Sequence, residues 1–146
     1  MKLKKVYHMG IPVDNLDRAR DFYTQVLGMD YLGRVGGNPD NPDALPIRGK
    51  VQKLDRLRCG EDDVVLFERP EPIQRDALGE DGIFHQAFDM NWEDYDDALK
   101  TAKEAGKYHR SVDRPSGKTI YMFDSEGNYL ELHFPAPGGR GVRQTV

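Results

Sequence analysis

Two segments of the chain alternate between apolar and polar positions, which is typical of half-buried strands. In residues 7–13, His8 lies on the face opposite the apolar side chains. In residues 84–90 the alternation is interrupted once, at Gln86, and again places a histidine, His85, on the less apolar face. Each pattern therefore predicts a strand whose histidine points away from the core.

A segment with helical spacing follows each of these strands. Apolar side chains recur three and four residues apart from Leu16 to Leu27 and again from Trp92 to Ala105. This spacing predicts two amphipathic helices, each with one face directed at the core. The capping and stop signals are Asp14 or Asn15 before the first helix, Gly28 after it, and Gly106 after the second.

Each half of the chain ends in a predicted hairpin, because two apolar runs flank a short polar turn. The expected strands are 51–59 and 64–68 in the first half, and 108–112, 119–124 and 128–134 in the second. Residues 31–48 are rich in Gly, Pro, Asn and Asp, which predicts a loop that is most mobile over 36–48.

The order of strand, helix and hairpin therefore occurs twice, and His8 and His85 occupy matching places in the two copies. We predict an α+β fold in which two βαβββ modules form a cupped, mostly antiparallel eight-stranded sheet with the two main helices outside. The chain is expected to be one domain, with module 1 at about 5–70, a linker at 71–82, module 2 at about 83–135 and a tail at 136–146.

Composition narrows the classes of function. The 146 residues carry a net charge of -4 and have no basic run of the kind that binds nucleic acid. No apolar stretch is long enough to span a membrane, and the start of the chain has no export signal. The single cysteine, Cys59, excludes an internal disulfide and a thiolate zinc cluster, so we expect a cytoplasmic protein whose metal ligands, if any, are histidine and carboxylate.

Three side chains form a candidate metal site. His8 and His85 lie on the first strand of their modules, and Glu131 lies on the last strand of the second, opposite in direction to its apolar neighbours. If the modules pack as equivalent halves, the three converge. Two imidazoles and one carboxylate suit Fe(II) or Mn(II), and Zn(II) or Ni(II) can also occupy such a site, with open positions for a substrate.

The competing interpretation treats each of these residues as structural: two half-buried histidines and an edge carboxylate. Their matching places in the repeat, their shared face and the cost of an unpaired charge in an apolar strand favour the metal site.

Two motifs resemble the vicinal oxygen chelate superfamily. One runs from His8 to Met29, and the other, Tyr-Met-Phe-Asp-Ser-Glu-Gly-Asn-Tyr-Leu-Glu-Leu-His, runs from Tyr121 to His133. The superfamily includes glyoxalases, extradiol ring-cleaving dioxygenases, fosfomycin-resistance thiol transferases and metal-free bleomycin-binding proteins. The resemblance implies paired βαβββ modules around a divalent metal, a small-molecule substrate and a homodimer.

Departures from the patterns of the superfamily restrict the reaction. Glyoxalase I and the epimerases have a fourth ligand where this chain has Val65, and Glu68 falls on the opposite face of a regular strand. Dioxygenases and fosfomycin transferases use two histidines and one glutamate, and both place a tyrosine ten residues before the glutamate, which is Tyr121 here. A three-residue turn with a left-handed Gly127 puts Tyr121 directly opposite Glu131, so that its hydroxyl can reach a metal-bound ligand. An ordinary edge-strand aromatic is the structural alternative for Tyr121.

Neither reaction is matched completely. The dioxygenases carry further histidines before the tyrosine, where this chain has only His109 at a different spacing. Lys118 and Arg140 are available to contact a phosphonate, but no potassium-binding loop is recognisable. The sequence thus favours Fe(II)-dependent, dioxygenase-like chemistry on a small aromatic or enediol substrate. The alternatives are a fosfomycin-type addition of thiol or water, a glyoxalase-like lyase, and a non-catalytic protein that sequesters a small molecule.

Overall fold

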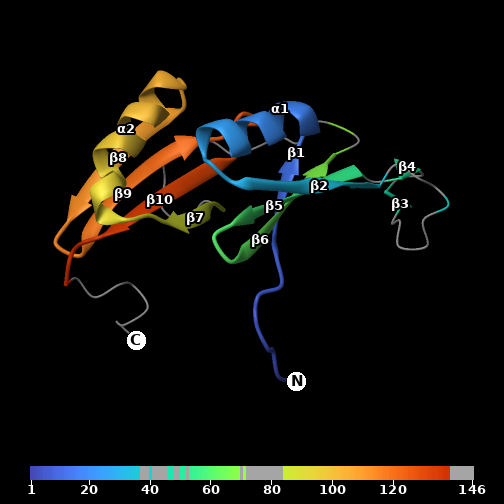
Figure 1. Ribbon diagram of the computed structural model, residues 1–146, viewed down its shortest axis with the longest axis horizontal. Helices are drawn as coiled ribbons and strands as arrows, with labels where there is room; N and C mark the ends of the chain where they lie inside the picture. Colours follow the sequence, from blue (N-terminus) through green and yellow to red (C-terminus); the bar gives the residue numbers. More distant parts are fainter. Residues whose placement is uncertain are drawn as a thin grey trace. The chain divides into compact units, whose positions relative to one another are not determined.

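The structure is a computed structural model that describes residues 1–36, 40, 46–47, 50–51, 53–69, 71 and 84–138. The chain divides into two compact units, Met1–Gln74 and Arg75–Val146, and each contains a four-stranded mixed sheet (Figure 1). The predicted α+β class with two βαβββ modules is confirmed. Most of the predicted 36–48 loop and of the 71–82 linker lies outside the described residues.

Unit 1 contains one sheet with the strand order β1-β6-β5-β2 and a separate two-stranded ribbon. Its elements are β1 (Met9–Val13), α1 (Leu16–Asp21), the π-helix η1 (Phe22–Val26), β2 (Asp30–Gly36), β3 (Pro46–Ile47), β4 (Lys50–Val51), β5 (Lys53–Cys59) and β6 (Asp62–Glu68). Strand β1 pairs in parallel with β6, and the other pairs are antiparallel. The core lies on the face of this sheet that carries the buried side chains of Ile11, Val13, Leu57, Val64 and Leu66.

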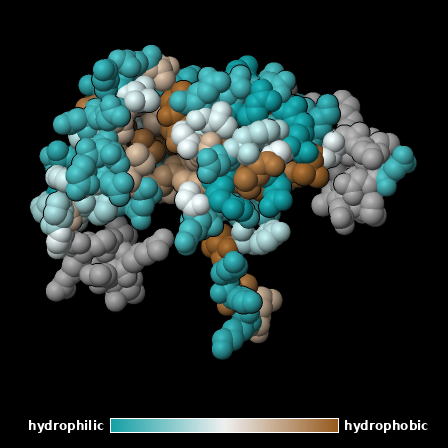
Figure 2. Space-filling model, in the orientation of Figure 1, coloured by the Kyte–Doolittle hydropathy of each residue, from teal (hydrophilic) through white to brown (hydrophobic). Residues whose placement is uncertain are grey.

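The prediction of a loop over 31–48 is wrong for residues 31–36, which belong to the edge strand β2, and for Pro46–Ile47, which form β3. The side chains of β2 are mostly exposed, so this strand lacks the alternation of buried and exposed positions from which the others were predicted. Gly33 has a positive φ of 132° and follows a register shift after Tyr31, as in a β-bulge. Figure 2 shows hydrophobic surface over this strand, where Tyr31, Leu32 and Val35 are exposed.

The first helix is positioned by polar groups at its start. The Asn15 side chain accepts a hydrogen bond from the backbone N–H of Arg18 at 2.9 Å, which confirms one of the two predicted caps. The carboxylate of Glu68 accepts a second one, from the backbone N–H of Leu16 at 3.2 Å. The last strand of the unit is thereby attached to the beginning of α1.

The end of the predicted helix is a wide turn rather than a continued α-helix. The N–H of Leu27 donates to the carbonyl of Phe22, five residues earlier, at 3.2 Å. Phe22 and Tyr23 are both buried although they are adjacent in sequence, and their rings pack edge to face at 5.6 Å. The wide turn therefore lets two consecutive aromatic residues enter the core.

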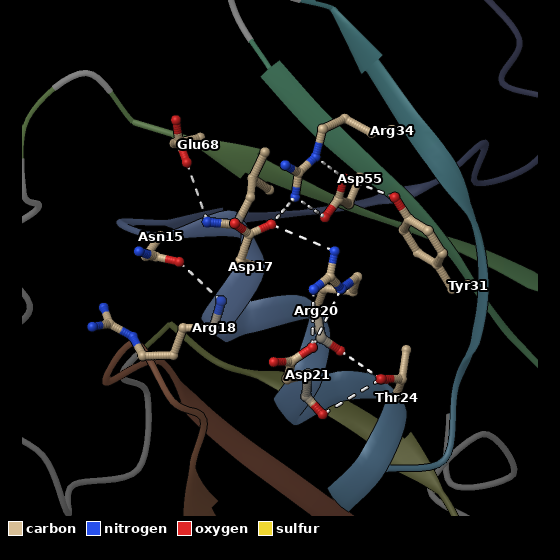
Figure 3. Close-up of polar contacts among 11 residues, drawn as sticks. Asn15, Asp17, Arg18, Arg20, Asp21, Thr24, Tyr31, Arg34, Asp55 and Glu68 are labelled. Carbon is tan, nitrogen blue, oxygen red and sulfur yellow. Dashed lines mark hydrogen bonds and ion pairs between the residues drawn. The ribbon is translucent and has the colours of Figure 1, made fainter.

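A buried ion pair connects β2 to β5. Asp55 is fully buried and accepts hydrogen bonds from Nε and Nη2 of Arg34 at 2.8 and 3.0 Å (Figure 3). Arg34 also donates to Asp17 of α1 at 2.8 Å. The hydrogen bond with Asp55 raises the pKa of Arg34, and the hydrogen bond from Arg34 lowers the pKa of Asp17. One guanidinium thus links the edge strand, its neighbour and the helix.

Unit 2 repeats the arrangement with the strand order β7-β10-β9-β8. Its elements are β7 (Gln86–Asp89), the 3-10 helix η2 (Trp92–Asp94), α2 (Tyr95–Glu104), β8 (Tyr108–Arg114), β9 (Gly117–Phe123) and β10 (Tyr129–Pro135). Strand β7 pairs in parallel with β10, whereas β9 pairs antiparallel with both β10 and β8. Across the described ranges, no helix is long and apolar enough to cross a membrane.

The turn between β9 and β10 fixes the register of the two strands. Its first residue, Asp124, is fully buried and accepts hydrogen bonds from the backbone N–H groups of Glu126 and Asn128 at 2.8 and 2.7 Å. Gly127 adopts the predicted positive φ, at 85°. As a result, Tyr121 pairs directly with Glu131, as predicted.

We expect Arg34→Ala to destabilise the protein, because it leaves the Asp55 carboxylate buried without its guanidinium. Arg34 is 35% exposed, so water screens part of the pair, and the expected loss is about 2–3 kcal/mol in the free energy of unfolding. Urea denaturation measures the difference. Lys100→Ala, which removes the exposed Lys100–Glu104 pair, is the control and should cost less than about 0.5 kcal/mol. Equal losses in both variants would contradict a structural role for Arg34.

A second prediction concerns Gly117, at the start of β9. Its φ is 154°, and a Cβ atom there would lie 2.5 Å from the backbone oxygen of Phe134. Because a backbone atom of the neighbouring strand cannot move aside, Gly117→Ala should cost at least about 2 kcal/mol in thermal or urea unfolding. Gly60→Ala has a positive φ but open space, and should cost about 1 kcal/mol. A Gly117 variant as stable as the Gly60 variant would refute the steric argument.

Candidate metal centre

The candidate site of unit 2 lies on the face of its sheet opposite the apolar side chains of Leu130 and Leu132. Glu131 pairs with Ala87 of β7 on one side and with Tyr121 of β9 on the other. His85 immediately precedes β7. We call His85, Tyr121, Tyr129 and Glu131 the site face.

The site face brings two of the three predicted ligands together. Nε2 of His85 and Oε2 of Glu131 are 3.0 Å apart, and the two side chains are 29% and 18% exposed. Both groups are therefore partly removed from water, and the two atoms lie within hydrogen-bond distance of each other.

This separation suits a shared metal ion. Two ligand atoms bound about 2.1 Å from one ion at right angles lie about 3 Å apart. An imidazole nitrogen and a carboxylate oxygen are also donors that Fe(II), Mn(II), Zn(II) and Ni(II) accept. The residues of unit 2 therefore fit a divalent ion, for which they would supply two ligands.

The third predicted ligand, His8, belongs to unit 1. It is exposed and lies just before β1, which begins at Met9 rather than at the predicted Tyr7. Its ring contacts those of Tyr7 and Phe67, at centroid distances of 5.1 and 6.1 Å. Neither unit alone has, among its described residues, a group of three His, Cys, Asp or Glu side chains that could hold a metal. The complete three-ligand set remains a prediction.

In strand β6 of unit 1, Val65 and Glu68 point to opposite faces of the sheet, as predicted. Val65 pairs with Gly10, two residues after His8, so the three positions share one face of the sheet. Glu68 faces the other way and binds the start of α1. Glu68 therefore does not replace the absent fourth ligand at Val65.

Tyr121 is surrounded by charged groups. The Arg110 guanidinium lies 4.4 Å from the centre of its ring, and the charges of Arg114 and Arg110 act to lower its pKa. Burial, and then the negative charge of Glu131, raise the pKa of Tyr121 above its ordinary value, against the opposing effect of the arginines. Tyr121 is therefore a neutral phenol near pH 7 and can donate its proton in a hydrogen bond.

Tyr129 is a further member of the site face that sequence reasoning missed. Its ring stacks on Tyr121 with centroids 5.4 Å apart and an angle of 14°, and it packs edge to face on His85 at 5.9 Å. Tyr129 lies two residues before Glu131 on the same strand, so strand periodicity alone places both side chains on one face.

The remaining candidates take other positions. His109 packs against the rings of Phe123 and Tyr129 at 5.3 and 5.9 Å. His133 pairs with Asp89 and Thr119 on the strand that carries Glu131. Arg140 lies outside the described residues.

Two other reactive side chains do not belong to the site face. Lys118 places its Nζ 5.0 Å from the ring of Trp92 and 4.5 Å from that of Tyr95, and therefore serves helix packing. Burial, together with the charge of Asp62, raises the pKa of Cys59, so its thiol is not activated.

The family profile described as the Glyoxalase/Bleomycin resistance protein/Dioxygenase superfamily matches residues 5–132. The chain belongs to this superfamily. The resemblance inferred from the two sequence motifs is therefore confirmed. No curated protein matches the chain.

Solved structures of three proteins share the fold of this superfamily member at low sequence identity. A glyoxylase/bleomycin resistance protein/dioxygenase domain from Frankia sp. EAN1pec is 21% identical, with a TM-score of 0.70 and coverage of 94% of this chain and 96% of that one. The fosfomycin resistance protein FosX from Listeria monocytogenes is 16% identical, with a TM-score of 0.71 and 98% of both chains covered. A glyoxalase family protein from Enterococcus faecalis is 23% identical, with a TM-score of 0.66 and coverage of 91% and 99%. At these identities the similarity establishes the fold alone.

Proposed function

We propose that the protein is a metal-dependent enzyme in which His8, His85 and Glu131 hold a divalent ion and a small substrate binds through its oxygen atoms. The observation that supports it most directly is the 3.0 Å approach of His85 Nε2 to Glu131 Oε2 on a half-buried sheet face. Fe(II) is the favoured ion on ligand type, and Mn(II), Zn(II) and Ni(II) suit the same donors. The FosX structure named above is that of its E126Q mutant in complex with Mn(II) and 1S,2S-dihydroxypropylphosphonic acid.

Each residue has a distinct role in this proposal. The ion, when bound, supplies Lewis-acid polarisation of a substrate oxygen. Tyr121, whose hydroxyl interacts with Arg114, donates a hydrogen bond to the polarised substrate. The guanidinium of Arg110, stacked on the same phenol, adds positive charge beside it. The residues around Tyr121 therefore stabilise negative charge that develops on the substrate.

This environment favours the addition of water or a thiol to an electrophile over ring cleavage. Two arginines act on Tyr121, whereas His109, the one candidate for the further histidines of dioxygenases, contacts the rings of Phe123 and Tyr129. Dioxygenase-like cleavage of an aromatic or enediol substrate is the second candidate, supported by the two-histidine, one-glutamate set. Oxygen uptake by the Fe(II)-loaded protein with a panel of catechols separates the two, because only cleavage consumes O₂.

Two further expectations belong to the proposal. We propose that the protein acts as a homodimer, as the resemblance implies, and sedimentation analysis tests this. We also propose a cytoplasmic location, which is compatible with the single free cysteine, Cys59.

The metal site is tested with His85→Ala. We expect the affinity for Mn(II), measured by calorimetry on chelator-free protein, to fall more than about 100-fold, because one ligand of the set is lost. The melting temperature should change little, since His85 is off the core face and its removal opens no core cavity.

The matched control is His133→Ala, which removes a histidine from the strand of Glu131 that is not a proposed ligand. It should bind Mn(II) as the wild-type protein does. Normal binding by His85→Ala would exclude His85 from the site. A wild-type protein that binds none of the four ions would overturn the proposed function and favour sequestration of a small molecule without catalysis.

A substitution at Val65 tests the number of ligands. Because Val65 pairs with Gly10, which lies two residues after His8 and on the same face, Val65→Glu should add a second carboxylate and tighten Mn(II) binding by at least about tenfold. The added ligand occupies an open position, so any reaction that needs two open positions should decline sharply. Val65→Gln, of similar size without the charge, should not tighten binding. A Val65→Glu protein that unfolds with no gain in metal affinity would identify Val65 as a core residue only.

A further inference from the structure

The hydroxyl of Tyr129 is a buried polar group for which the described residues provide no hydrogen-bond partner. The residue is 3% exposed, and its hydroxyl oxygen has no hydrogen-bond partner in the part of the chain that the structure describes.

An unpartnered buried hydroxyl is unfavourable, because the group loses its hydrogen bonds to water and gains none in return. Phenylalanine would supply the same ring without this penalty. A tyrosine at this position is therefore expected to have a partner other than the residues that the structure describes.

The surroundings of Tyr129 indicate where that partner binds. Its ring is in contact with His85 and Tyr121, and it projects from the same face as Glu131, two residues along β10. Phe123 packs against it at 5.7 Å and His109 at 5.9 Å. These contacts hold the ring, while the hydroxyl proton can still rotate to donate or accept.

We propose that the Tyr129 hydroxyl hydrogen-bonds to an oxygen atom of the bound substrate and that Tyr129 is a specificity-determining residue. The inference rests on the proposed function, since it requires an oxygen-bearing ligand at the metal site. It adds a second phenol to the site face, beside Tyr121, whose fixed ring preorganises its contact with the substrate.

Tyr129→Phe tests the proposal, because it removes only the hydroxyl. Metal-free protein should melt at the same temperature as the wild type or higher, since no internal hydrogen bond is lost. Mn(II) affinity should be unchanged, because Tyr129 is not a ligand. Two oxygen-bearing probes, 4-nitrocatechol and inorganic phosphate, are then titrated into the Mn(II)-loaded protein. The affinity for whichever probe binds should fall about tenfold in the variant.

Tyr108→Phe is the matched control. It removes a phenol hydroxyl from the same unit that is hydrogen-bonded to Ser111 at 2.9 Å. It should bind both probes as the wild type does.

Three results would overturn the proposal: equal probe affinity in Tyr129→Phe and wild type, a clearly lower melting temperature of the metal-free variant, or no binding of either probe to loaded wild-type protein. In each case the proposed function survives if the wild-type protein binds metal and His85→Ala does not. Failure of the wild-type protein to bind metal would instead contradict the proposed function.

Discussion

The parallel pairing of the first strand with the last strand of each unit is the constraint on which the rest of the structure depends. In unit 2 this pairing joins β7 to β10 and places His85, more than forty residues before Glu131 in the sequence, beside it. A parallel pair requires a long crossover, and here the crossover contains a helix and two further strands. Because the entropy cost of closing a loop grows slowly with its length, the pairing tolerates such a connection. The side chains at the two ends of this crossover are held in place by the paired strands β7 and β10 and not by a flexible loop.

The two faces of the unit 2 sheet carry different kinds of side chain and have different roles. One carries the apolar side chains, including Ile120, Leu130 and Phe134, and stabilises the fold by burial. The other carries a carboxylate, an imidazole and two stacked phenols, which burial alone would disfavour. Their mutual contacts reduce that cost. A strand with alternating faces can therefore support a polar site without interrupting the core beneath it.

Much of this fold could be predicted because its signals are local. The Asn15 cap, the left-handed Gly127 and the pairing of Tyr121 with Glu131 each follow from a few adjacent residues and the geometry of a turn. Strand β2 could not, since an exposed edge strand has no buried side to produce alternation. The π-helical turn was also missed, because two adjacent aromatic residues fit the helical spacing equally well.

For the candidate site, the sequence predicted which residues share a sheet face but not the distances between their side chains. Sequence pattern indicated that His85 and Glu131 share a face, but their 3.0 Å separation depends on side-chain packing. Tyr129 was overlooked because an aromatic residue in a strand normally serves packing, and only the structure reveals its unsatisfied hydroxyl.

The bulge in β2 has a consequence for solubility. An edge strand with exposed Tyr31, Leu32 and Val35 offers a row of backbone hydrogen-bonding groups and an apolar surface, the combination that recruits strands from other chains into aggregates. Gly33 interrupts the regular spacing of these backbone groups. The neighbouring Arg34, which is hydrogen-bonded to Asp55, adds positive charge at the edge. Such an irregularity disfavours the addition of another strand at this edge, and a sequence that straightened it should pair there more readily.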